Sequence, residues 1–459
     1  MTNDFLNPPL SRRQMLRTSA CGFGYLALAD LCARAAGTQT VEPLGAKAPH
    51  FKARASRVIF LYMQGAPSHV DTFDYKPRLQ SDSGKTVDGK KGGARKLLAS
   101  PFKFARHGRS GLWLPDIFPN LAKHADDLCL LNSMYTDVAV HPQATIQLHT
   151  GNFRFVRPSM GAWVLYGLGT MNKDLPGFLT INPAGGAQSY GSAFLPAAYQ
   201  GTKIDNVGRK GNSQIANIEN PQLTAKLQRK QLDLLGSLNR QQLAKDEVNP
   251  DLEGVIESYE LAFRMEGAVP EVMDLSAEKK ETLAAYGIDE PGTDRFGRQC
   301  LLARRFAEKG VRFIELGIGN WDQHNNLKAK LTENAHAIDK PIAALLADLK
   351  QRGMLKDTLV VWGGEFGRTP AAQGKDGRDH NNKGFSMWMA GGGTKGGYRH
   401  GATDEHGLAA VDKKMHINDL HATLLYLLGL DHTRLTYQYS GREIRLTDLA
   451  GVVASDVVA

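Results

Sequence analysis

Carboxylate and imidazole side chains gather near three apolar runs in the second half of the chain. Asp322 and His324 follow the first run, Glu365 ends the second, and His380 precedes the third. In an open α/β sheet, side chains just beyond the carboxyl ends of strands are placed to form binding sites. Mixed oxygen and nitrogen donors suit hard or borderline divalent cations such as Zn, Ca, Mg or Mn. We therefore predict a divalent metal site built from these four residues.

The spacing around three of these residues adds to the prediction. One residue lies between Asp322 and His324, so on an extended segment both side chains point the same way. His380 follows Asp379, an acidic neighbour that can orient an imidazole ligand. The alternative for both segments is a polar loop that faces water.

Further candidates occur elsewhere in the chain. His69 and Asp71 follow the apolar run 58–63 with the same one-residue spacing, so we include them among the predicted metal ligands. Glu365 closes an apolar strand, and a buried carboxylate must be ligated, paired or hydrogen-bonded. Its alternative role is an ion pair with Arg368.

His141 is the main catalytic candidate, together with Arg368. It begins a helix-compatible segment, 141–149, that ends at Thr150-Gly151. An imidazole at this place could ligate a metal, accept a phosphoryl group, or act as an acid or base. The alternative is a helix-start residue that is hydrogen-bonded to the backbone.

Composition narrows the class of protein. The 459 residues are 42% hydrophobic and 22% charged, as in a soluble globular protein. The formal charge of +9 is scattered, without a basic stripe interleaved with aromatic residues, which argues against nucleic-acid binding. Outside the first 35 residues the only cysteines are Cys129 and Cys300, too few for a disulfide framework.

The N-terminus has the pattern of an export signal. Arg12-Arg13 precedes a weakly apolar stretch, 20–33, and small residues at 33–36 offer a cleavage site. That stretch is too short and polar to span a bilayer stably, so we expect no transmembrane segment after processing. We predict a twin-arginine signal peptide at 1–35, the twin-arginine translocase as a transient partner, and a periplasmic or otherwise exported protein. The alternative is an amphipathic N-terminal helix.

The remaining chain predicts a linker at 36–55 and one domain at 56–459. Apolar strand-like runs alternate with helical patterns, which is typical of an α/β fold with a largely parallel central sheet flanked by helices. Residues 116–125 are expected to form a helix. A Leu-, Gln- and Lys-rich stretch with few glycines predicts a helical insertion at about 220–290.

Several short motifs, in order, resemble one known family. They are Gln64-Gly65-Ala66-Pro67-Ser68-His69-Val70-Asp71, Thr150-Gly151, Pro158-Ser159-Met160-Gly161, Glu365-Phe366-Gly367-Arg368-Thr369-Pro370, Arg378-Asp379-His380 and His416-Ile417-Asn418-Asp419. The chain resembles the sulfatase-like family catalogued as domain of unknown function 1501, which looks like a branch of the alkaline phosphatase superfamily. The resemblance implies an alkaline phosphatase/sulfatase-like fold, one or two divalent metals at a sheet edge, and phosphate or sulfate ester chemistry.

Two departures from the superfamily pattern concern the chemistry. The nucleophile position, ten residues before Gly151, holds His141, and neither Cys nor Pro-x-Arg follows it. Formylglycine therefore cannot form there. Superfamily hydrolases usually have Asp-His-Gly where this chain has Glu365-Phe366-Gly367, so one imidazole ligand is missing.

Two functions follow as hypotheses. The first is an exported metal-dependent hydrolase of phosphate or sulfate esters, with anionic small molecules and glycan esters as substrates and without formylglycine chemistry. The second is a non-catalytic protein that binds a polysaccharide or a partner on a sulfatase-like scaffold. The missing nucleophile favours the second, and the many potential metal ligands favour the first.

Overall fold

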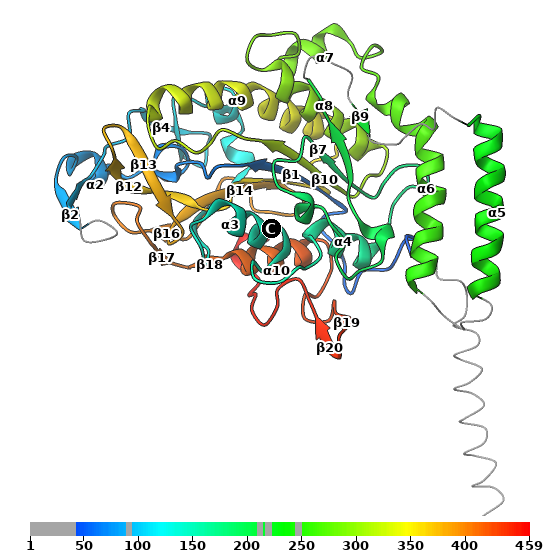
Figure 1. Ribbon diagram of the computed structural model, residues 1–459. Helices are drawn as coiled ribbons and strands as arrows, with labels where there is room; N and C mark the ends of the chain where they lie inside the picture. Colours follow the sequence, from blue (N-terminus) through cyan, green and yellow to red (C-terminus); the bar gives the residue numbers. More distant parts are fainter. Residues whose placement is uncertain (1–42, 89–93, 209–213, 216–222, 244–249) are drawn as a thin grey trace, which may run out of the picture.

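The structure is a computed structural model that describes residues 43–88, 94–208, 214–215, 223–243 and 250–459 (Figure 1). The predicted signal peptide, 1–35, and residues 36–42 of the predicted linker lie outside this part of the chain. Within it, no helix combines the length and apolar character needed to cross a membrane.

A ten-stranded sheet forms the centre of the molecule, and β1 (Arg57–Met63) lies in its middle. β1 pairs in parallel with β10 (Phe313–Ile318) and β11 (Thr358–Gly363), and the parallel part continues through β7 (Phe178–Ile181) and β8 (Thr202–Asp205). The largely parallel sheet predicted from the sequence is therefore confirmed.

The remaining strands extend the sheet at both edges. β14 (Phe385–Gly391) runs antiparallel to β11 and to β6 (Leu128–Tyr135), so β6 points the same way as the central strands. β15 (Tyr398–His400) and β18 (Met415–His416) pair in parallel with β6, and β9 (Gln214–Ile215) closes the far edge.

Helices cover both faces of the sheet, because its strands are apolar on both sides (Figure 1). Alternate residues of β1 enter two different cores. One core includes α8 (Asp294–Glu308) and α9 (Leu327–Gln351). The other includes α4 (Met160–Leu168) and α10 (Ile417–Leu427), and α3 (His141–Thr150) lies on the same side.

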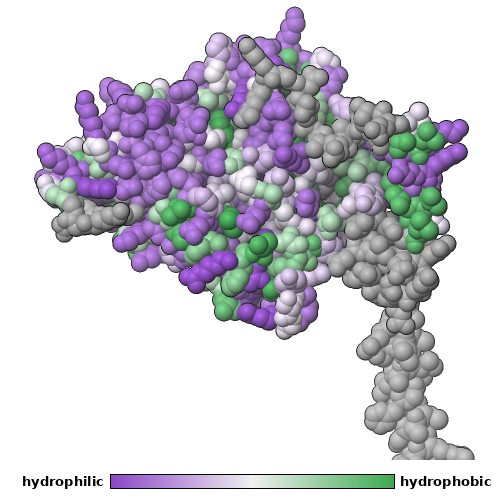
Figure 2. Space-filling view, viewed as in Figure 1, coloured by the Kyte–Doolittle hydropathy of each residue, from purple (hydrophilic) through white to green (hydrophobic). Residues whose placement is uncertain are grey.

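The predicted insertion region is helical, with α5 (Ala225–Leu243), α6 (Pro250–Met273) and α7 (Lys280–Ala285). α5 and α6 stand side by side at one end of the molecule (Figure 1). Val269 and Val272 of α6 are buried in the core, whereas Leu234 and Leu238 of α5 are exposed. Figure 2 shows apolar side chains over α5.

The expected helix at 116–125 is wrong. A 3-10 helix, η2 (Leu121–Asp127), replaces it. Phe118 precedes Pro119, and a residue before proline is sterically disfavoured in the α region. The α-helical pattern therefore cannot begin where the apolar spacing suggested.

Short elements form hairpins and turns around the sheet. β12 (Gly367–Gln373) and β13 (Gly377–Asn381) form an antiparallel hairpin that the sequence analysis did not predict. The others are η1 (His69–Asp71), α2 (Pro77–Ser81), β2 (Thr86–Asp88), β3 (Ala94–Lys96), β4 (Phe104–His107), β5 (Leu112–Pro115), η3 (Ala187–Ser189), η4 (Ala197–Tyr199), β16 (Ala402–Thr403), β17 (Ala410–Asp412), β19 (Tyr437–Tyr439), β20 (Arg442–Ile444) and η5 (Ser455–Val457).

Candidate metal centre

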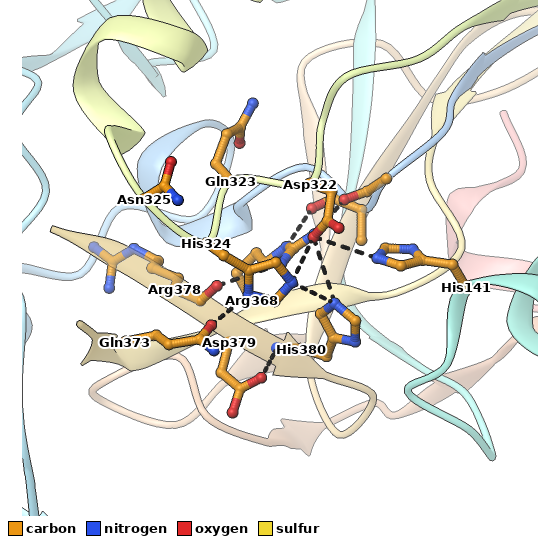
Figure 3. A network of polar contacts seen from close by, with 12 residues as sticks. His141, Asp322, Gln323, His324, Asn325, Arg368, Gln373, Arg378, Asp379 and His380 are labelled. Atoms are coloured by element: carbon orange, nitrogen blue, oxygen red, sulfur yellow. Dashed lines mark hydrogen bonds and ion pairs between the residues drawn. The ribbon is translucent and has the colours of Figure 1, made fainter.

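The candidate site lies at the carboxyl edge of the central strands (Figure 3). Asp322 and His324 follow β10, and Glu365 follows β11. His141 is the first residue of α3, which follows β6, and His380 comes from the β12–β13 hairpin. Because these strands point the same way, residues far apart in the sequence meet at one edge of the sheet.

Three imidazoles converge on one carboxylate oxygen, Asp322 Oδ1. His324 Nε2 lies 2.8 Å from it, and His380 Nε2 and His141 Nε2 each lie 3.4 Å from it. His324 Nε2 and His380 Nε2 are 3.0 Å apart. His141, Asp322 and His380 each offer one donor atom within 4.8 Å of the others, a spacing that one metal ion can bridge. The structure thus brings together Asp322, His324, His380 and His141, as predicted.

The outer nitrogen of each imidazole faces a hydrogen-bond acceptor. His380 Nδ1 donates to the Ala139 carbonyl at 2.8 Å, and His141 Nδ1 donates to Glu365 Oε1 at 2.5 Å. His324 Nδ1 donates to Gln373 Oε1. In the neutral ring a protonated Nδ1 leaves a lone pair on Nε2. All three lone pairs therefore point toward Asp322 Oδ1.

Such a set of acceptors is unfavourable without a cation. A carboxylate oxygen and neutral imidazole nitrogens cannot satisfy one another, and the buried His141 Nε2 has no hydrogen-bond partner among the described residues. Metal-binding histidines commonly donate their other N–H to a carboxylate or carbonyl, as these do. The donor set fits a divalent cation.

Buried Arg368 holds Asp322 in place. Its Nη2 lies 2.5 Å from Asp322 Oδ1, and its other N–H groups donate to the carbonyls of Ala66, Gly65 and Arg378. Since most of its donors are thus engaged, the arrangement favours a positioning role for Arg368. Contrary to the ion pair considered from the sequence, its carboxylate partner is Asp322 and not Glu365.

Charge and burial set the protonation of two site residues. Burial raises the pKa of Asp322, but the Arg368 guanidinium outweighs it and lowers that pKa to about 2. Burial lowers the pKa of His380 from its ordinary value. Asp322 is therefore ionised and His380 is held neutral near pH 7, which are the states that bind a metal.

The family follows from the sequence as a whole. Residues 55–458 match the family described as "Protein of unknown function (DUF1501)". The chain belongs to this family. The resemblance drawn from its short motifs is thereby confirmed, whereas no curated protein matches the chain.

Solved structures similar to this DUF1501 protein include a synthase, a sulfatase and an alkaline phosphatase. The lipoteichoic acid synthase LtaP from Listeria monocytogenes has 10% sequence identity and a TM-score of 0.37, and the match covers 89% of this chain and 79% of that chain. The PsFucS1 sulfatase from Pseudoalteromonas sp. has 12% identity and a TM-score of 0.37, and the match covers 82% of this chain and 68% of that chain. A mutant of TAB5 alkaline phosphatase with Mg bound in its M3 site has 11% identity and a TM-score of 0.34, and the match covers 82% of this chain and 99% of that chain.

Glu365 lies behind His141. Its buried carboxylate accepts the Gly65 N–H at 3.0 Å and the Tyr62 hydroxyl at 3.2 Å, besides His141 Nδ1. Tyr62 in turn contacts the Thr145 hydroxyl at 2.7 Å. With these partners in place, we assign Glu365 to the support of His141, in place of the metal ligation expected from the sequence.

His69 and Asp71 do not join the cluster in the DUF1501 chain. Asp71 forms a buried ion pair with Arg378, with Oδ2 2.6 Å from Nε and Oδ1 3.1 Å from Nη2. His69 Nε2 contacts the Gly407 carbonyl at 2.7 Å. Both residues belong to the 3-10 turn η1, so the extended geometry on which their spacing argument depended is absent. We therefore withdraw both residues as predicted metal ligands.

A buried ion pair near the site was missed. His149 Nε2 lies 3.2 Å from Glu315 Oε2, and both side chains are inaccessible to solvent. Glu315 lies within an apolar strand, a position at which a carboxylate requires a partner. The sequence shows Glu315 inside an apolar run, which predicts that it has a partner, but it does not identify His149 as that partner.

Proposed function

We propose that Asp322, His324 and His380 hold a divalent cation, and that this centre hydrolyses phosphate or sulfate esters with His141 as general base. The observation that carries the proposal is the convergence of lone-pair imidazole nitrogens on Asp322 Oδ1. The proposed reaction needs no formylglycine.

The donor chemistry supports zinc over calcium or magnesium. Catalytic zinc sites commonly have three protein ligands from His, Cys or carboxylate and leave a further position open. Calcium and magnesium prefer oxygen donors. Asp322 is 43% exposed at its side chain and His324 is 33% exposed, so a small molecule can reach the centre. A bound cation polarises an ester oxygen and stabilises the negative charge that develops there.

His141 differs from the other two histidines in its outer partner. His380 and His324 face the neutral Ala139 carbonyl and the Gln373 amide, which fix a tautomer but carry no charge. His141 faces the Glu365 carboxylate, which stabilises the imidazolium that forms when Nε2 takes a proton. We therefore assign His141 to accept a proton from the attacking water molecule.

Local charge favours an anionic substrate. His141 begins α3, so the positive end of that helix dipole faces the site. The Arg368 guanidinium, 2.5 Å from Asp322, adds a second positive group, and the cation adds a third. Phosphate and sulfate esters, including those on glycans, are therefore the proposed substrate class.

The test is turnover of p-nitrophenyl phosphate and p-nitrophenyl sulfate by the purified protein. We expect hydrolysis of at least one ester, its loss after chelation, and its return when zinc is added back. If neither ester is turned over in any metal state, the hydrolase proposal is wrong, and binding of polysaccharide or a partner without turnover is then the function to test.

We also propose export by the twin-arginine route, with the signal peptide at 1–35, the linker at 36–55 and the folded domain at 56–459. The Arg12-Arg13 pair and the apolar stretch behind it support this proposal. Changing both arginines to lysine should leave the precursor in the cytoplasm. Normal export of that double variant would contradict it.

A further inference from the structure

A pocket of about 370 Å³ lies beside β6, separate in its lining residues from the metal centre. Tyr75, Arg106 and Trp113 contribute to it from the segment after η1 and the β4–β5 hairpin, and Asn132 and Arg399 contribute from β6 and β15. Its volume falls within the range of small-molecule sites, roughly 300–1,000 Å³.

One wall of the pocket is aromatic. The rings of Tyr75 and Trp113 are 4.7 Å apart and inclined at 40°. The Phe104 ring stacks on Tyr75 with centroids 4.9 Å apart, which restricts the movement of the Tyr75 ring. Rigid aromatic surfaces of this kind bind the apolar face of a ring-shaped ligand at little cost in side-chain entropy.

Two arginines give the pocket positive charge. Arg106 lies over the Trp113 ring at 5.2 Å, and Arg399 reaches the pocket from β15. Within the described part of the chain, neither guanidinium forms an ion pair with a carboxylate. Two like charges that line one pocket repel each other, and an anion would relieve the repulsion. Guanidinium groups bind carboxylate, sulfate and phosphate groups through paired hydrogen bonds.

Asn132 adds a hydrogen-bond acceptor. Its Nδ2 donates to the Phe73 carbonyl at 2.8 Å and to Asp74 Oδ1 at 3.1 Å, which fixes the orientation of the amide. Its Oδ1 is buried and has no partner among the described residues, and the side chain is 1% exposed. An unpaired buried acceptor is unfavourable, so the ligand should bring a donor such as a hydroxyl group. A sulfate or carboxylate alone cannot donate this bond.

We propose that this pocket binds an acidic sugar unit, sulfated or carboxylated. The ligand must offer an apolar ring face to Tyr75 and Trp113, an anionic group to Arg106 and Arg399, and a hydroxyl donor to Asn132. An acidic pyranose combines all three. The pocket is an anchoring site for such a glycan and does not depend on hydrolysis at the metal centre.

The test is calorimetric titration of the full chain after treatment with a chelator, so that a metal ion at the proposed centre cannot hold the anion. The probes are N-acetylglucosamine 6-sulfate and glucuronate, with glucose and inorganic sulfate for comparison. We expect one acidic sugar to bind per chain, more tightly than either comparison probe. Binding should also change the fluorescence of Trp113, a change that Trp113→Leu abolishes.

Variants locate the binding in this pocket. Arg106→Gln combined with Arg399→Gln should weaken binding of the acidic sugar by at least about tenfold. Arg109→Gln is the matched control, since Arg109 is 99% exposed on the same hairpin and does not line the pocket, and it should bind as the parent does. Equal melting temperatures of these variants would show that the fold is intact.

Three results would overturn the proposal. They are the absence of acidic-sugar binding to the parent, binding that the double variant leaves unchanged, and inorganic sulfate binding as tightly as the sulfated sugar. Because no ester is hydrolysed in this test, its failure is distinct from failure of the proposed hydrolase function.

Discussion

Glu365 Oε1 and His141 Nδ1 are 2.5 Å apart, although 224 residues separate them in the sequence. The carboxylate is inaccessible to solvent, whereas the imidazole is 22% exposed and directs Nε2 toward Asp322. This relationship gives His141 a fixed tautomer, as the other two histidines have, and also a charged partner at Nδ1, where the partners of the other two are neutral.

Glu365→Gln should separate catalysis from metal binding. The substitution keeps the shape of the side chain but removes the charge that stabilises imidazolium at His141, so we expect turnover to fall by about 10²–10⁴-fold. Metal content should remain at the parent level, because Glu365 is not a proposed ligand. Kinetics with the p-nitrophenyl esters and metal analysis measure both effects.

The control for this variant is Glu405→Gln, the same change at an exposed loop position, which should leave both properties unaltered. Loss of the metal from Glu365→Gln, with the fold intact, would instead make Glu365 a ligand, as first expected from the sequence.

The Asp71–Arg378 pair should stabilise the fold without contributing to metal binding. Both side chains are inaccessible to solvent, so Asp71→Asn leaves a buried guanidinium without its counter-charge. We expect the free energy of unfolding in denaturant to fall by about 3–5 kcal/mol. The metal content of the folded fraction should not change.

The exposed pair Lys203–Asp205 provides the comparison for Asp71, and Asp205→Asn should alter stability by less than about 1 kcal/mol. Metal loss from Asp71→Asn at unchanged stability would instead show that Asp71 is a metal ligand.

His421 should make the metal-free protein less stable in acid. Burial lowers the pKa of His421 from 6.5 to about 4. Between these values the unfolded chain binds a proton that the folded protein does not, so stability falls as the pH falls through this window. Protonation of His421 should therefore lower the free energy of unfolding by about 3 kcal/mol once the pH has fallen below this window. Denaturant unfolding at pH 7, 5.5 and 4.5 measures it.

His421→Gln removes the titrating group and should flatten this pH dependence. The surface change His336→Gln should retain the parent dependence. A variant that lost stability in acid as steeply as the parent would show that other groups cause the effect. His69 is one such group, since burial lowers its pKa as well.

Much of the fold could be predicted because its strands are apolar. The runs that became β1, β10 and β11 are buried on both faces, so composition alone marks them as central strands. The β12–β13 hairpin could not be found in this way. Its residues are mostly polar or glycine, and its pairing depends on contacts with the rest of the site.

In the candidate site, too, residue types could be predicted from the sequence but contact partners could not. The residue types identified Asp322, His324 and His380, but not which carboxylate Arg368 would meet. His69 and Asp71 have the spacing of a ligand pair, yet a 3-10 turn directs Asp71 to Arg378. The spacing of residues in one sequence does not show which side chains from distant segments will form an ion pair.

The most direct measurement is the metal content of the purified protein. We predict about one divalent ion per chain, with zinc the preferred metal, and a clear loss of that ion in His324→Ala at an unchanged melting temperature of the metal-free protein. The surface control His336→Ala should retain the metal. A parent protein that takes up no divalent metal when supplied with it, or a His324→Ala variant that holds the full amount, would contradict the account.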